Sequence, residues 1–184
     1  MLNCTTLELM PAGEVDEKWG GFEDGDGLDL NPHDPIPLNL GEWFTQDVLL
    51  LWVQQAARWV AWEGLRFSGA AASDDALYPG SMRGLLAFAY ITDVFDGEAI
   101  VRRCEFPGPF RTLAGGATPY LDDLIRFRRR NVELLISTVA IVLERAVRER
   151  LRFSGSALPS QLEAHFHELA LERLMIAHHL DSPD

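Results

Sequence analysis

The chain has 184 residues, of which 47% are hydrophobic and 24% are charged, and this composition is typical of one globular domain rather than of a disordered chain. A formal net charge of -12 argues against a uniformly basic nucleic-acid-binding protein, because phosphate contacts need a positive surface. Cys4 and Cys104 lie too far apart in sequence to form a metal-binding or redox motif. With no basic leader and no apolar run of membrane-spanning length, the sequence predicts a cytoplasmic protein that does not contact membranes.

The charges are distributed unevenly along the chain. Residues 1–49 hold eleven acidic residues and one basic residue, Lys18. Residues 97–152 hold eleven arginines and seven acidic residues. One basic segment therefore lies inside an acidic chain, and the distribution of charge says more about binding partners than the total does.

Residues 1–40 are predicted to form an irregular acidic arm, because they are rich in glycine, proline and aspartate and lack helical periodicity. A group of aspartates that begins with Asp24 and Asp26 looks like a calcium-binding loop. It departs from the EF-hand pattern because Leu28 stands where the third oxygen ligand belongs. No metal is therefore predicted in the arm.

Residues 41–184 are predicted to form a single all-α domain, since no segment alternates with the period of two expected of a strand. Apolar residues at three- and four-residue steps predict helices over 42–67, 77–95, 131–153 and 161–180. The first of these helices carries Trp43, Trp52 and Trp59, for which burial in the core is the favoured environment and a broad interface the alternative.

Three shorter helical segments are predicted between the long ones, over 98–104, 110–114 and 119–131. Thr118 is predicted to cap the third, with Pro119 at its first position. That third segment either ends near residue 131 or continues into the next helix. Two short helices, a glycine turn and an arginine-bearing helix follow the order of a helix-turn-helix over about residues 97–131.

Three sequence elements succeed one another between Tyr78 and Leu135. They are the apolar helix that closes on Asp93-Val94-Phe95, then Phe110-Arg111-Thr112-Leu113-Ala114-Gly115-Gly116, then Ile125-Arg126-Phe127-Arg128-Arg129-Arg130. In order and spacing, these elements resemble the N-terminal domain of bacterial DDE-type insertion-sequence transposases. The resemblance covers about a third of the chain.

This resemblance implies contact with double-stranded DNA at the end of a transposable element. Family members carry a separate RNase-H-like domain that holds metal through three carboxylates, whereas this sequence predicts only further helix after the arginine run. We therefore expect no catalysis and no cofactor. The chain also departs from the family at Asp96-Gly97-Glu98, where relatives are polar and basic, and at Asp122 and Asp123, which begin the predicted recognition helix with negative charge.

The predicted DNA-binding residues are all arginines. Arg126, Arg129 and Arg130 are expected to share one helical face. The complete predicted set is Arg102, Arg103, Arg111, Arg126, Arg128, Arg129 and Arg130. The alternative is an ordinary solvated face, since arginine suits the C-terminal end of a helix in any case.

A repeat of apolar residues near every 3.5 positions runs through residues 131–153, flanked by arginines. This seam is expected to pack either against another helix of the same chain or against a second copy, in a possible homodimer. His165 and His167 do not have the spacing of a zinc-binding pair. No catalytic motif, metal site or small-molecule site is predicted.

Three hypotheses follow from the sequence. The first is a non-catalytic, transposase-derived DNA-binding protein, either a regulator or a truncated transposase. The second is a protein–protein interaction or oligomerisation module that has lost DNA binding. In the third, residues 14–34 of the acidic arm cover the arginine face and inhibit it.

Overall fold

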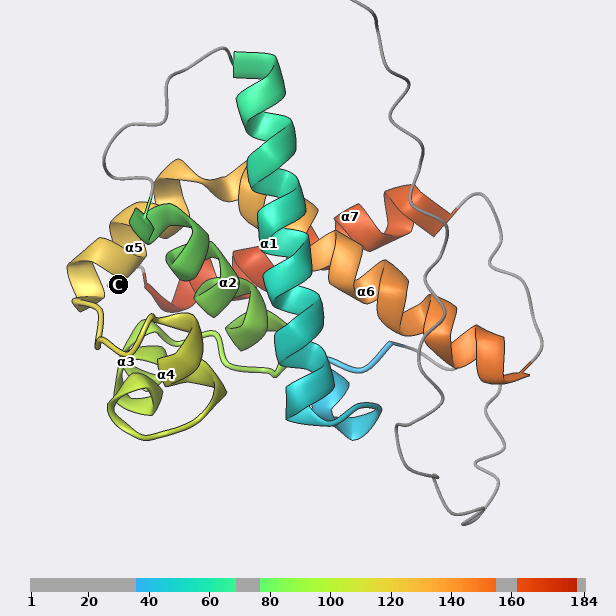
Figure 1. Cartoon of the computed structure of the whole chain (residues 1–184), viewed down its shortest axis with the longest axis horizontal. Coiled ribbons are helices and arrows are strands. Elements are labelled where there is room, and N and C mark those ends of the chain that lie inside the picture. Colours follow the sequence, from blue (N-terminus) through green and yellow to red (C-terminus); the bar gives the residue numbers. More distant parts are fainter. Residues whose placement is uncertain (1–35, 69–76, 155–161, 182–184) are drawn as a thin grey trace, which may run out of the picture.

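The computed structural model describes residues 36–68, 77–154 and 162–181, and within these ranges it contains seven α-helices, one 3-10 helix and no strand (Figure 1). The predicted all-α fold is confirmed. The elements are η1 (Leu40–Glu42), α1 (Gln46–Ser68), α2 (Leu77–Ile91), α3 (Gly97–Glu105), α4 (Pro109–Leu113), α5 (Leu121–Arg130), α6 (Val132–Ser154) and α7 (Leu162–Leu180). None of these described helices combines the length and the apolar character needed to cross a membrane.

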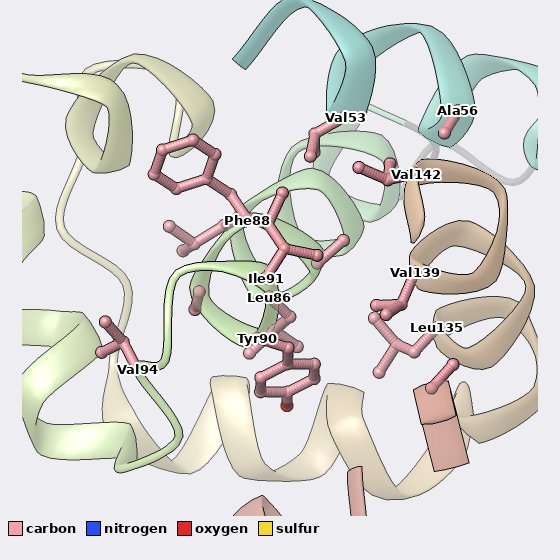
Figure 2. Packing of buried hydrophobic residues seen from close by; sticks show 14 of the residues in the cluster. Val53, Ala56, Leu86, Phe88, Tyr90, Ile91, Val94, Leu135, Val139 and Val142 are labelled. Atoms are coloured by element: carbon pink, nitrogen blue, oxygen red, sulfur yellow. The ribbon is translucent and has the colours of Figure 1, made fainter. Parts of the chain in front are cut away.

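The core is built around α2, which packs against α1, α4 and α6. Every residue from 84 to 91 is buried, so this helix is apolar on all sides rather than along one stripe. Figure 2 shows Val53 of α1 and Val142 of α6 approaching the part of α2 that carries Phe88 and Ile91. The predicted apolar surface of this helix is therefore present, and three other helices cover it.

The apolar seam of α6 is buried within the same chain. Leu135, Val139, Val142 and Leu143 are fully buried, and α6 packs against α1, α2 and α7. This answers the question that the sequence left open. The apolar seam of residues 131–153 therefore packs against other helices of the same chain, which is one of the two arrangements expected from the sequence.

The predicted start of the arginine-bearing helix needs correction, and of the two ends left open the structure has the one near residue 131. Helix α5 begins at Leu121 and its N-cap is the extended residue Tyr120, so Thr118 does not cap it. The helix ends at Arg130, and its C-cap Asn131 has φ -124° and ψ 33°. The Asn131 side chain donates a hydrogen bond from Nδ2 to the Phe127 carbonyl at 2.9 Å. Helices α5 and α6 are therefore separate.

The tryptophans of the first predicted helix have different environments. Trp52 is 7% exposed and belongs to the core, whereas Trp59 is 60% exposed on the outer side of α1. Trp43 precedes α1 and is half-buried. Burial was thus correctly predicted for Trp52 and wrongly predicted for Trp59.

The last residues of the predicted arm belong to the folded domain. Leu40 is fully buried, and Nη2 of Arg173 in α7 donates a hydrogen bond to the Pro37 carbonyl at 2.8 Å. Asn39 forms an isolated antiparallel bridge with Thr92. The folded domain therefore includes residues 36–40, which leaves residues 1–35 of the predicted arm untested. Those residues, with the aspartates that look like a calcium-binding loop, lie outside the described ranges.

Candidate nucleic-acid interface

Asp96 and Gly97 shape the start of α3. Asp96 caps the helix, because its side-chain oxygens accept hydrogen bonds from the backbone nitrogens of Glu98 at 3.3 Å and Ala99 at 2.9 Å. At Gly97, a Cβ atom would lie 2.7 Å from Cδ1 of Leu121. Asp96 and Gly97 therefore have local structural roles, and they bring the first turn of α3 against the first turn of α5.

A glycine pair makes the turn after α4. Gly115 has φ 69° and Gly116 has φ 83°, a region that side-chain-bearing residues rarely adopt. The Gly116 nitrogen donates a hydrogen bond to the Arg111 carbonyl at 2.9 Å, which closes the turn. This glycine pair lets the chain reverse between α4 and α5 within a few residues.

Two of the predicted DNA-binding arginines hold α3 and α4 together. Nη1 of Arg111 donates to the carbonyls of Cys104 at 3.2 Å and Glu105 at 3.3 Å. These carbonyls lie at the C-terminal end of α3, where helical hydrogen bonding runs out. The guanidinium of Arg103 lies 5.3 Å from the centre of the Phe110 ring. Arg111 is half-buried in this role, whereas Arg103 is exposed.

The outer side of α5 carries exposed arginines, as the helical spacing predicted. Arg126, Arg129 and Arg130 are exposed. Arg126 forms an ion pair with Asp123 at 3.3 Å. Within the described residues, Arg129 and Arg130 have no carboxylate within ion-pair distance. On α3, Arg102 is also exposed and lies 4.0 Å from Asp96.

Arg128 does not belong to this exposed set, and its predicted role in DNA contact is wrong. Its side chain is 2% exposed and forms an ion pair with Asp181, just beyond α7. The guanidinium also donates to the carbonyls of Ala177 at 2.8 Å and Phe95 at 3.2 Å. Arg128 follows Leu124 by four residues and so shares its buried face. That spacing was the signal in the sequence that could have placed it inside.

Two other arginines, neither marked by a sequence pattern, are also buried. Arg83 of α2 is 5% exposed and donates to the Ala57 carbonyl of α1 at 2.9 Å. Arg173 of α7 is 1% exposed and holds the segment before η1. Arginine in this chain is thus a core residue as well as a surface residue. No pattern near Arg83 or Arg173 identified their long-range carbonyl partners.

The charge of α5 changes sign along its length. Asp122 and Asp123 occupy the first turn, and Arg129 and Arg130 occupy the last. This order matches the helix dipole, which favours negative charge at the N-terminal end and positive charge at the C-terminal end. The positive part of the surface is therefore the C-terminal half of α5, next to Asn131.

The reactive side chains near this unit are protected by burial. Burial raises the pKa of the Cys104 thiol to about 11, an effect that Arg111 partly opposes. Burial likewise raises the pKa of the Tyr90 hydroxyl, while the charge of Arg128 lowers it. Both groups are therefore protonated at neutral pH. Among the described residues, no three histidine, cysteine or acidic side chains come together as metal ligands.

No protein-family model, curated protein or solved structure matches this chain.

Proposed function

We propose that this chain is a non-catalytic, transposase-derived protein that binds double-stranded DNA through arginines of α3 and α5. The observation that carries the proposal is the exposure of Arg129 and Arg130 without a carboxylate partner in the described residues. Such cations can replace the counterions of DNA phosphates without first breaking an ion pair. The resemblance to the transposase domain supports DNA, rather than another polyanion, as the ligand.

The proposed contact is with the phosphate backbone rather than with bases. Recognition helices usually read bases with their N-terminal residues, and here Asp122 and Asp123 occupy that end and are exposed. Arg129 and Arg130 lie at the opposite end of α5. Arginines directed at phosphates position a protein on the duplex without reading its sequence. We therefore propose sequence-independent binding that depends strongly on salt.

The proposal is tested by measuring fluorescence anisotropy of labelled duplex DNA between about 20 and 200 mM salt. Each phosphate contact contributes roughly 0.9 to the slope of log affinity against log salt. Changing Arg129 and Arg130 together to Ala should lower that slope by about two and weaken binding. Arg148→Ala is the matched control, because Arg148 is an exposed arginine on α6 and lies outside the proposed surface. Absence of binding by the wild-type chain at the lowest salt would refute the proposal.

A protein–protein interaction or oligomerisation module is the second candidate function. It is supported by large apolar side chains on the outer surface of α7, where Leu171, Met175 and Leu180 are exposed. Singly exposed apolar residues are common, but several on one helix indicate a contact surface. If the chain binds no DNA and light scattering shows a stable oligomer, this function replaces DNA binding.

Inhibition by the acidic arm is a further proposal about the same arginines. Residues 14–34 would compete with DNA for the C-terminal half of α5. Because Leu40 is in the core, the deletion should remove residues 1–35 only. Affinity for duplex DNA should then rise, and the gain should shrink as salt screens the arm. An unchanged affinity at low salt would exclude inhibition by the arm.

A further inference from the structure

The outward side of α1 carries an apolar stripe. Val48 is 37% exposed, Leu51 50% and Trp59 60%. Together with the exposed Gln55, these residues follow one another at steps of three and four, so they lie along one side of the helix. We call Val48, Leu51, Gln55 and Trp59 the α1 stripe. The opposite side of α1 packs on α2, α4 and α6, and α1 stands at the front of the molecule in Figure 1.

Two opposite charges lie beside the α1 stripe. Asp47 and Arg58 are both exposed. They are eleven residues apart, which is about three helical turns or roughly 16 Å along the axis. A separation of whole turns places both on the same edge of the stripe. The acidic residue lies toward the N-terminal end of α1 and the basic residue toward its middle.

We propose that the α1 stripe binds the same stripe of a second copy of this chain, with the two helices antiparallel. The two-fold axis of such a pair reverses the helix direction and keeps corresponding edges on the same side. Asp47 then faces Arg58 of the partner subunit, and Arg58 faces Asp47 of the partner subunit. In a parallel pair, the charged edges would lie on opposite sides of the contact and could not meet.

The same arrangement brings the apolar groups together. Val48 lies opposite Trp59 of the partner subunit, and Leu51 and Gln55 lie closest to the two-fold axis. Trp59 lies toward each end of this contact, and tryptophan is among the residues whose truncation most often weakens an interface. The contact involves one helix from each copy. The surface buried per partner should therefore be smaller than the roughly 800 Å² of a standard interface. We therefore expect a reversible dimer that forms at tens of micromolar protein.

The other apolar surfaces fit this role less well. The seam of α6 is buried by α1, α2 and α7. The outer side of α7 exposes Leu171 and Met175, but no arginine or lysine is exposed on that helix. Among the described parts of the helices, α1 alone combines exposed apolar residues with a permanent cation and an anion spaced to pair with a second copy. This inference does not rest on DNA binding.

A charge swap on the full-length chain tests the proposal. Sedimentation velocity from about 1 to 200 μM should show the wild-type chain in monomer–dimer exchange. Asp47→Arg alone, or Arg58→Asp alone, places like charges opposite each other twice and should weaken the dimer by about tenfold or more. The double variant D47R/R58D exchanges the charges and should restore the dimer to within about threefold of wild type.

The controls separate this geometry from other assemblies. Asp122→Arg changes an exposed aspartate of α5 and should leave the dimer unchanged, while Trp59→Ala should weaken it. Circular dichroism checks that each variant keeps its helices. A wild-type chain that stays monomeric at 200 μM overturns the proposal. So does a dimer that neither single charge change weakens, or one that the double swap fails to restore.

Discussion

Two arginine-rich stretches of this chain look alike in sequence and differ in the structure. In α5, Arg126, Arg129 and Arg130 face solvent, and Arg128 is buried. In the second half of α6, two arginines lie against tryptophan rings of α1 and the segment that precedes it. Arg145 lies 4.9 Å from the centre of the Trp52 ring, and Arg150 lies 4.1 Å from that of Trp43.

The difference teaches that a run of arginines does not define a ligand-binding surface by itself. An arginine stacked on tryptophan contributes packing and a cation–π attraction within the fold. Arg148 of α6 is paired with Glu144 on the same helix. Arg129 and Arg130 of α5, by contrast, meet no ring and no carboxylate in the described residues. The neighbouring side chains decide which arginines are available to a partner.

The largest expected effect is a loss of stability when the buried ion pair on the inner side of α5 is broken. The Asp181 side chain is 5% exposed and pairs with the buried Arg128. Asp181→Asn leaves a buried charge without its partner and should lower the free energy of unfolding by about 3–5 kcal/mol in urea titrations. Asp123→Asn breaks the exposed pair with Arg126 on the outer side, and it should cost less than about 1 kcal/mol. Equal costs for both variants would contradict the contrast between the two sides.

The next largest effect is a pH-dependent change in stability caused by Cys104. This residue lies near the end of α3, and its carbonyl accepts a hydrogen bond from Arg111. Its pKa is raised by burial from 9.0 to about 11, so the folded state favours the protonated thiol. This stabilisation is fully present below pH 9 and is lost as the pH rises toward 11. Relative to Cys104→Ala, the wild-type chain should lose about 1 kcal/mol of stability between pH 8 and pH 10. A constant difference between the two chains over this range would show that the thiol is not buried.

A smaller effect compares the two stretches directly. Arg145→Ala removes the cation over Trp52 and the hydrogen bond to Gln55, and should cost about 0.5–1 kcal/mol in thermal unfolding. Arg129→Ala removes an exposed side chain and should stay within about 0.5 kcal/mol of wild type. If Arg129 proved the more costly of the two, it would have a structural partner and could not be the free cation proposed for DNA.

The smallest effect concerns Arg148, which pairs with Glu144 four residues earlier. Such exposed pairs stabilise a helix by only about 0.3–0.5 kcal/mol. Arg148→Ala should therefore leave the urea midpoint nearly unchanged and leave DNA affinity at the wild-type level. A clear loss of DNA affinity would extend the proposed DNA surface from α5 to α6 and remove the distinction between the two stretches.

Much of the fold could be predicted because helical periodicity is local. The apolar steps in residues 77–95 and 131–153 located α2 and α6, and the i, i+3, i+4 spacing placed Arg126, Arg129 and Arg130 together on the outside. The first residue of α5 was harder to predict. Proline at 119 satisfies the rules for a helix start, although Tyr120 is the actual N-cap. The exposure of Trp59 could not be predicted either, since its position in the helical repeat is compatible with a buried or an exposed side chain.

By itself, the sequence determined the all-α class, the order of the helices and the separation of acidic from basic segments. These features depend on residues within a few positions of one another, where backbone hydrogen bonding and side-chain spacing are set locally. Only the tertiary structure decided which cations remain exposed. Arg128 meets Asp181 across 53 positions and Arg173 meets Pro37 across 136. Such partners are chosen by the packing of whole helices, because a buried guanidinium must find acceptors wherever the fold brings them.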